Sequence, residues 1–294
     1  MDWEDLRTTL AVVRVGSIAA AARELGVAHT TVYRRLAAFE EASGVRFFTR
    51  ADGAYVATQA GRDLFEMGAD VEARVTAIER KLSGRDLRLD GEVTVATMEP
   101  LALALSEHIR AFRRSTPEVR VRLHVGNENV DLARGEADIA IRATSAPDES
   151  LIGRKLANVA FAVYASRGYA RNAKVVLRDA DWICFDASLA KTPQGKWEVE
   201  NVPTERVVLS TNSRVVFAEA VASGAGIGVL PCGLAARSPH LVALTPALEG
   251  LAMPLWMLTH ADLVGVPRVR ALRDYLSAAI DRERSLLEGP GASG

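Results

Sequence analysis

Apolar residues near the start of the chain recur at helical spacing in three separate segments: 3–15, 18–25 and about 30–42. A single glycine follows each segment: Gly16, Gly26 and Gly44. A glycine just past a helix readily adopts the left-handed conformation that ends it, and Ser17 is a typical N-cap for the second segment. The pattern therefore predicts three short helices that share an apolar core.

The segment Val45–Thr58 changes to the spacing of two short strands around Asp52-Gly53. An Asp-Gly pair between such strands is a strong signal for a hairpin turn. Three small helices followed by a hairpin form the winged variant of the helix-turn-helix. We therefore predict an N-terminal all-α winged helix-turn-helix domain over residues 1–58.

Residues 59–88 carry one long helical pattern with a narrow apolar seam. Alternating steps of four and three separate the members of this seam, as in a coiled coil: Leu64, Gly68, Val71, Val75, Ile78 and Leu82. So narrow a seam on so long a helix favours a second helix opposite it. We predict a linker helix that pairs two copies through Leu64, Val71, Val75, Ile78 and Leu82. The alternative is an amphipathic helix that lies on its own domain.

From Gly91 onward, apolar strand segments alternate with helical ones, which is typical of a doubly wound parallel α/β sheet. The predicted strands lie at these positions: 93–98, 119–125, 139–144, 161–166, 182–186, 207–211, 227–231 and 255–259. We predict a two-lobed domain over 89–294. Lobe 1 takes about 89–162 and 262–288, lobe 2 takes about 163–261, and the chain crosses between them near 158–166 and near 257–262.

The turn at Gly26 would place the start of the third helix where it can enter a DNA major groove. Short or planar side chains at that start can bond base edges, and nearby arginines can reach phosphate or guanine. The predicted DNA-binding residues are Ser17, His29, Thr30, Thr31, Tyr33, Arg34, Arg35 and Arg50. The alternative is two short core helices that carry solvated arginines.

Charge and cysteine content narrow the class of protein. A net charge of −1 excludes a globally basic coat protein for nucleic acid, and residues 1–62 hold eight arginines and seven acids, a net charge of +1. DNA affinity must then come from the placement of the charges and from combining copies. Cys184 and Cys232 lie in apolar runs without a CxxC partner, as reduced thiols of a cytoplasmic protein do. No segment resembles a signal peptide or a membrane span.

The residues give little support for catalysis. Five histidines show no spacing typical of a metal site, and the chain has no GxSxG elbow. The glycines in 224–228 come after a helical segment and before a strand, the reverse of a dinucleotide-binding loop, so we interpret them as a helix cap. We expect no metal, no cofactor and no catalytic residue.

Several segments, in this order, resemble LysR-type transcriptional regulators. They are GSIAAAARELGVAHTTVYRRLAAFEEASGVRFFTR, ATQAGRDLF, NVDLARGEADIAIR, VASGAGIGVLP and LWMLTHADLVGVPRVRALRDYL. The resemblance implies a winged helix-turn-helix, a dimerising linker helix, a two-lobed effector domain similar to periplasmic binding proteins, and homotetramers built from two homodimers. The family usually has Ser-Gln-Pro at Ala28, His29 and Thr30 and serine at Tyr33, so this chain is expected to have a base preference of its own.

A small-molecule effector would bind beyond the carboxyl ends of the strands, between the two lobes. The candidate residues there are Thr97, Met98, Glu99, Asn127, Arg142, Thr144, Asp186, Thr211 and Asn212. The family often has Ser or Thr where Met98 stands. Glu99 would repel a carboxylate or attract a cation, whereas Arg142 would pair with an acid. The alternative for Glu99 and Arg142 is that they cap loops.

The sequence thus predicts a DNA-binding regulator that a small molecule controls, without a membrane partner. Two other classes remain open. One is a solute-sensing α/β binding protein whose N-terminal domain only oligomerises. The other is an enzyme that acts on the ligand between its lobes, which the lack of a nucleophile with a nearby base disfavours.

Overall fold

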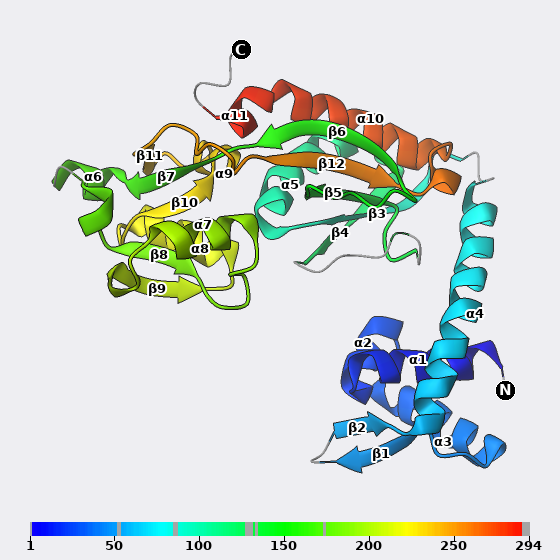
Figure 1. Cartoon of the computed structure of the whole chain (residues 1–294). Coiled ribbons are helices and arrows are strands. Elements are labelled where there is room, and N and C mark those ends of the chain that lie inside the picture. The colour runs from blue at the N-terminus through cyan, green and yellow to red at the C-terminus, as the bar shows by residue number, and fades with distance from the viewer. Residues whose placement is uncertain are drawn as a thin grey trace. The chain divides into compact units, whose positions relative to one another are not determined.

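The structure is a computed structural model that describes six ranges of the chain: 2–51, 54–84, 88–126, 132, 135–172 and 175–289. The chain forms two compact units, residues 1–80 and residues 81–294, and each is treated by itself below. Figure 1 shows the order of the helices and strands in both units.

The first unit contains the elements that the sequence predicts. They are α1 (Trp3–Val15), α2 (Ile18–Leu25), α3 (His29–Ser43), β1 (Phe48–Ala51), β2 (Ala54–Ala57) and α4 (Gln59–Gly84), which continues past the end of the unit. β1 and β2 pair antiparallel, as a wing does. The predicted hairpin turn at Asp52-Gly53 lies outside the described residues. The winged helix-turn-helix is therefore confirmed in its helices and its two strands.

Local capping fixes the ends of these helices. Gly16, Gly26 and Gly44 all adopt left-handed backbone conformations with φ of 64°, 66° and 67°, which a side chain would oppose. The Ser17 side chain accepts a hydrogen bond from the backbone N–H of Ala20 and so caps α2. Because each signal acts within a few residues, the predicted boundaries agree with the structure.

The helix α4 packs closely on α1 near Gly68. A Cβ atom added at Gly68 would lie 2.8 Å from a methyl group of Leu10. Leu64 also packs against the buried core of the winged helix-turn-helix. The first part of the predicted seam therefore faces its own domain, as the alternative interpretation proposed, and only the later part faces away.

In the second unit, lobe 1 is built on a five-stranded sheet in the order β4-β3-β5-β12-β6. Its strands and helices are β3 (Gly91–Thr97), α5 (Glu99–Ser115), β4 (Val119–Val125), β5 (Ile139–Ala143), β6 (Ile152–Val159), β12 (Met253–Thr259), α10 (Pro267–Arg282) and α11 (Arg284–Glu288). A short 3-10 turn, Ala261–Leu263, precedes α10. Glu283 separates these last two helices.

Lobe 2 is built on two small sheets, in the orders β10-β7-β11 and β8-β9. Its elements are β7 (Phe161–Ser166), α6 (Arg167–Asn172), β8 (Trp182–Phe185), α7 (Pro193–Asn201), β9 (Val207–Thr211), α8 (Arg214–Ser223), β10 (Gly228–Pro231), α9 (Cys232–Ala235) and β11 (Leu241–Ala243). Two further 3-10 turns lie at Leu177–Asp179 and Thr204–Arg206. A bridge between Trp182 and Ile227 connects the two sheets.

The structure corrects the predicted sheet in two respects. First, the sheet of lobe 1 is mixed, because β12 runs antiparallel to both β5 and β6 while β3 runs parallel to β4 and β5. Second, β12 belongs to lobe 1, so the chain returns from lobe 2 between Ala243 and Met253 and not near 257–262. The reason is that a strand joins whichever sheet offers it partners, and its own pattern does not name those partners. The first crossing, at Ala160 between β6 and β7, lies within the predicted range.

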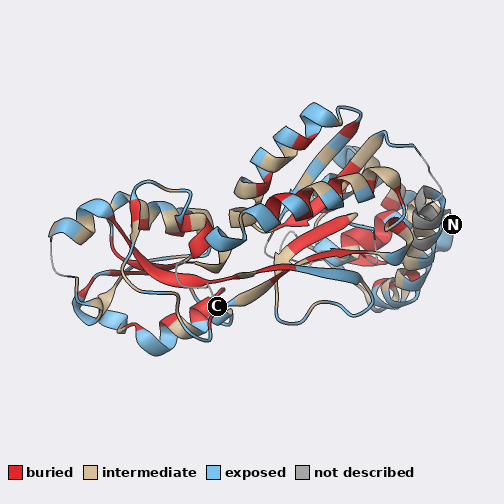
Figure 2. Cartoon of the chain, turned by 90° about the horizontal axis from the view of Figure 1, so that it is seen from above, coloured by how far each residue is buried: buried red, intermediate tan, exposed pale blue. Residues whose placement is uncertain are grey.

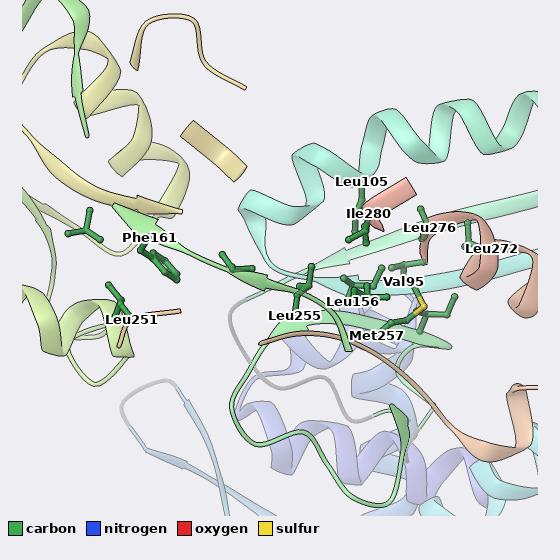
Figure 3. Close-up of a cluster of buried hydrophobic side chains, with 14 of the residues drawn as sticks. Val95, Leu105, Leu156, Phe161, Leu251, Leu255, Met257, Leu272, Leu276 and Ile280 are labelled. Atoms are coloured by element: carbon green, nitrogen blue, oxygen red, sulfur yellow. The ribbon is translucent and has the colours of Figure 1, made fainter. Parts of the chain in front are cut away.

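The core follows the alternation of side chains along the strands. On β7, Phe161 and Val163 point into the largest apolar cluster, whereas Ala162 and Tyr164 point into a second cluster on the other face. Figure 3 shows Phe161 with buried side chains of lobe 1, including Leu255 and those of α10. Buried residues gather on the strands and on the helix faces that cover them (Figure 2). The two lobes therefore share a continuous core at the crossing.

Candidate functional site

The exposed face of α3 carries most of the predicted DNA-binding residues. His29, Thr30, Tyr33 and Arg34 are exposed, and Thr31 is half-buried. The opposite face is buried in the core of the unit through Val32, Leu36 and Phe39. Burial on one side fixes the helix, so the polar side chains of the other side are presented together to solvent.

Two of the predicted DNA-binding residues, Arg35 and Ser17, are engaged within the helical part of the unit. The Arg35 guanidinium lies 2.7 Å from the carboxylate of Glu4 on α1, which holds it on the three-helix core. Ser17 caps α2, as described above. Arg35 would have to leave Glu4 to reach phosphate. Arg34, in contrast, lies on the exposed face of α3.

The wing presents Arg50 in a fixed place. Its guanidinium donates to the Tyr55 hydroxyl at 3.0 Å and lies over the Tyr55 ring, 5.2 Å from the centroid. The start of the wing is tied to α3 by Glu40, whose carboxylate accepts from the backbone N–H groups of Phe47 and Phe48. The arginine of the wing and the polar face of α3 therefore belong to one rigid arrangement.

The later part of the α4 seam is exposed. Val71, Ile78 and Leu82 have exposed fractions of 43%, 59% and 65%, and Val75 is half-buried. Large apolar side chains in such a row are rarely left to water on a long helix. This segment of α4 is the part of the seam that is free to pack against another helix.

A cavity of about 220 Å³ lies between lobe 1 and lobe 2. Lobe 1 contributes the start of α5, the end of β5 and α11, and lobe 2 contributes the end of β8 and the starts of α7, α8 and α9. Val159 and Phe161, on either side of the first crossing, also line it. The cavity thus touches both lobes and the strand that joins them.

Two of the predicted effector residues line this cavity: Met98 and Arg142. Glu99 follows Met98 at the first position of α5, and its carboxylate lies 3.4 Å from the Ser213 hydroxyl of lobe 2. Glu99 therefore connects the lobes beside the cavity. Asn127 lies outside the described residues.

The remaining candidates serve the backbone near the cavity and do not line it. The buried Thr97 hydroxyl donates to the carbonyl of Ile141 at 2.8 Å. Thr144, Asp186 and Thr211 accept hydrogen bonds from backbone N–H groups two residues further on. Asn212 lies in the same loop as Thr211 and is absent from the cavity wall. For these residues the strand-end position was predicted correctly, but the side chains of Thr144, Asp186 and Thr211 stabilise loops and that of Thr97 bonds to β5.

Sequence reasoning missed most of the cavity wall. From lobe 2 it omitted Gln194 on α7, Arg214 on α8 and Arg237 just after α9, and it omitted Leu286 and Leu287 on α11. The available signal was a helix start: Thr192 caps α7 and Ser213 caps α8 in the structure. No local pattern indicated that α11 would reach the crossing strand.

Arginines dominate the charge of the cavity. Burial lowers the pKa of Arg142 and of Arg214, and for Arg214 the nearby Glu99 charge acts in the opposite direction. The Arg214 guanidinium lies 5.4 Å from the centroid of the Phe185 ring, which also lines the cavity. These cations are therefore held in poorly solvated surroundings.

Arg237 of lobe 2 links to lobe 1 through two carboxylates. Its guanidinium lies 2.5 Å from Glu283, at the break before α11, and 3.1 Å from Glu107 on α5. His108 on α5 lies 3.3 Å from the same Glu283 carboxylate. This cluster connects the lobes at the edge of the cavity.

A buried carboxylate lies behind the lobe 2 wall. Glu198 on α7 is 3% exposed and accepts from the backbone N–H of Phe185 at 2.8 Å and from the Gln194 amide at 2.9 Å. Burial raises its pKa to about 7, although both hydrogen bonds act to lower it. Burial also raises the pKa of Cys184 to about 12, with a smaller contribution from the Glu198 charge. Glu198 is the buried acid that joins α7 to β8.

The state of the cysteines and the role of the glycines in 224–228 agree with the sequence analysis. Cys184 and Cys232 are buried free thiols. Gly224 ends α8 in a left-handed conformation, and a Cβ at Gly228 would lie 2.6 Å from the Phe217 ring, so these glycines cap a helix and allow close packing. Within the described residues, no three His, Cys, Asp or Glu side chains form a group that could hold a metal ion. None of the described helices is both long and apolar enough to cross a membrane.

Two family models together match most of the chain. The family model described as "LysR substrate binding domain" matches residues 88–281, and the model described as "Bacterial regulatory helix-turn-helix protein, lysR family" matches residues 3–62. The chain therefore belongs to the LysR family of bacterial helix-turn-helix transcriptional regulators. The resemblance stated from its motifs is confirmed, and so is the predicted fold class.

Individual relatives are regulators as well. The Mau operon transcriptional activator of Paracoccus denitrificans is 29% identical over 79% of this chain and 80% of its own length. The regulator CbbR of Xanthobacter flavus is 25% identical over 98% of this chain and 90% of its own. A helix-turn-helix regulator of Xanthomonas campestris pv. campestris is 32% identical, but the match spans 56% of this chain and only 49% of that protein.

Solved structures share the fold across nearly the full length. The virulence activator AphB of Vibrio cholerae has a TM-score of 0.64 at 19% identity, covering 95% of this chain and 99% of that one. CrgA of Neisseria meningitidis, a LysR-type regulator, has a TM-score of 0.55 at 21% identity, covering 95% and 99%. At these identities the likeness establishes the fold alone.

Proposed function

We propose that this regulator reads a DNA major groove with the exposed face of α3 and grips the backbone with the wing. The observation that carries the proposal is the division of α3 into two faces: Val32, Leu36 and Phe39 anchor one, and His29 and Arg34 stand on the other. A recognition helix needs this arrangement, because base-reading side chains must be presented on a fixed axis. Arg50 on the wing would contact phosphate.

Pairing through α4 would supply the affinity that one weakly charged domain lacks. We propose that the exposed apolar row Val71, Ile78 and Leu82 packs against the same row of a second copy. Two linked DNA-binding domains bind one operator far more tightly than a single domain does, because the second contact becomes intramolecular. Leu64 is left out of this interface, since it packs against its own domain.

We propose further that a small molecule in the cavity between the lobes controls DNA binding. The cavity touches both lobes and the crossing strand, so an occupant that bridges the lobes would change how they are held together. A ligand can shift such an equilibrium only by binding one arrangement more tightly than the other. A ligand that contacts both lobes can differ in its affinity for the two arrangements of the lobes.

The decisive test is binding of the full chain to the DNA upstream of its own gene. Affinity should fall steeply as salt rises, because lysine and arginine contacts release counterions from DNA. Arg34→Ala should weaken operator binding by about 1–3 kcal/mol without altering the fold. Arg110→Ala on α5 makes the same change in net charge on an exposed residue of the other unit, and it should leave affinity unchanged.

Two results would count against DNA reading by α3. One is binding to that DNA with no dependence on salt. The other is an Arg34→Ala variant that binds the operator as tightly as the Arg110→Ala control does.

A further inference from the structure

The cavity between the lobes combines apolar walls with charged groups of mostly one sign. Its described apolar lining includes Met98, Leu101, Val159, Phe161, Met253 and Leu286. The charged residues among the described lining are Arg142, Arg214, Arg237 and Glu283. A cavity of this kind favours a ligand that is mainly apolar and carries an anionic group at one end.

The three arginines of the cavity come from different parts of the chain. Arg237 lies between Glu283 and Glu107, so an acidic partner stands on either side of it. Arg142 comes from the end of β5 in lobe 1, and Arg214 from the start of α8 in lobe 2. Both also make contacts within the protein. Because guanidinium groups can bind a carboxylate by paired hydrogen bonds, this pair can hold one anion from two lobes.

Burial supports this assignment. The pKa of Arg142 and that of Arg214 are both lowered, because their charges are removed from water. A carboxylate in the cavity would offset that loss of solvation. The carboxylate of Glu99 acts on Arg214 and offsets part of the positive charge of the two arginines, so that they can still match one carboxylate of a ligand. A second carboxylate on the ligand would therefore meet repulsion.

The helix α11 forms part of the apolar wall of the cavity. Leu286 and Leu287 line it, and the carbonyl of Leu287 accepts from the backbone N–H of Ala160 in the crossing strand at 2.9 Å. This helix begins at Arg284, beyond the last residue of the family match at 281. Part of the apolar wall of the cavity is thus formed by a segment that the family model does not include.

We propose that the cavity binds a monocarboxylate with an apolar body about the size of a benzene ring, with the carboxylate between Arg142 and Arg214 and the apolar end against α11. The volume fits this size, since an engineered apolar cavity of about 150 Å³ binds benzene and this one has about 220 Å³. The proposal rests on the proposed function in that this ligand would be the effector.

Direct binding to the full chain tests the ligand class without DNA. The probes are benzoate, its neutral analogue benzamide and its cationic analogue benzylamine, each followed by calorimetry and by the shift in unfolding temperature. Benzoate should bind at least about tenfold more tightly than benzamide, since a charged hydrogen-bonding partner is lost, and benzylamine should not bind. Equal binding of the three probes would overturn the proposal, and so would the absence of benzoate binding at millimolar concentration.

Variants test the two arginines and α11 separately. Arg142→Gln and Arg214→Gln should each weaken benzoate binding by roughly 10- to 100-fold, whereas Arg110→Gln on the exposed face of α5 should not. Leu286 is 46% exposed, so Leu286→Ala should leave the fold intact. That variant should shift preference from benzoate towards 4-propylbenzoate. Unchanged benzoate affinity in both arginine variants would refute the carboxylate site, and an unchanged preference would refute the role of α11.

The operator assay separates this proposal from the proposed function. Benzoate binding that leaves operator affinity unchanged would support the ligand class and overturn control of DNA binding by this cavity. Salt-dependent operator binding by a chain that binds none of the carboxylates would overturn the ligand class and leave DNA reading intact.

Discussion

The buried Glu198 should make the stability of the lobed unit depend on pH. Its carboxyl group loses its proton near the usual pKa of 4.5 in the unfolded chain and near about 7 in the folded one. Between these values the folded state binds more protons than the unfolded state, so stability falls as pH rises. The contribution is fully present below pH 4.5 and has been lost above pH 7.

The size of the effect follows from the two pKa values. At 1.36 kcal/mol for each pKa unit, the gap between 4.5 and about 7 corresponds to about 3 kcal/mol. Glu198→Gln keeps the length of the side chain and an oxygen for the backbone N–H of Phe185, but it removes the titration. Its new amide nitrogen would face the amide of Gln194, which adds an offset that is independent of pH. The slope with pH is therefore the quantity to compare.

Urea unfolding followed by tryptophan fluorescence provides the measurement. Trp182, Trp197 and Trp256 lie in the lobed unit and only Trp3 lies in the winged unit, so the signal reports mainly on the lobes. Glu200→Gln, an exposed residue on the same helix, is the matched control and should keep the wild-type slope. Identical slopes for wild type and Glu198→Gln between these pH values would refute the argument.

Three further outcomes are expected. Val71→Asp combined with Ile78→Asp should reduce the chain to a monomer in sedimentation, because charged groups would replace the exposed apolar row of α4. Arg237→Gln should increase hydrogen exchange at α9 and lower the unfolding free energy of the lobes by about 1 kcal/mol, since it loses both carboxylate partners. Gly228→Ala should lower that free energy by about 1–3 kcal/mol in urea unfolding, because its Cβ would lie 2.6 Å from an aromatic ring.

Each of these has a control within the chain. For α4, the exposed Arg74→Gln should sediment like the wild type, and a double variant that does the same would show that the row is not an interface. For the link between the lobes, the control is Arg178→Gln, which changes an exposed arginine that does not line the cavity. Equal hydrogen exchange at α9 in both variants would exclude a role for Arg237. For Gly228, the control is Gly265→Ala, which has open space for its Cβ and should leave the unfolding free energy nearly unchanged. An equal loss of unfolding free energy in both variants would disprove the packing argument.

The family motifs and the winged helix-turn-helix could be predicted from the sequence for a physical reason. Helix caps and hairpin turns act over a few residues, so Ser17, Gly26 and the spacing within α3 contain the information that forms them. The same locality made the exposed positions of α3 predictable. It did not reveal that Arg35 binds Glu4, because that pair joins two helices far apart in sequence.

The arrangement of the lobes required the tertiary structure. The edge strand β6 begins with exposed residues that include Arg154, so it lacks the apolar run by which other strands were predicted. β12 has such a run, yet its partners β5 and β6 are set by packing over long sequence distances. The cavity wall has the same origin, since α11 and the start of α8 meet there only after the chain has crossed twice between the lobes.

The chain's sequence by itself determined what kind of protein this is: the glycine caps, the apolar periods and the order of the motifs define a LysR-type regulator with a reading helix. Only the tertiary structure decided which side chains can contact DNA, a second copy or a ligand. In the folded chain, Leu64 packs against its own domain and Arg35 binds Glu4. Arg142 and Arg214 line one cavity. Local pattern specifies elements because their hydrogen bonds and caps are local, whereas a site is a set of distant residues that packing alone brings together.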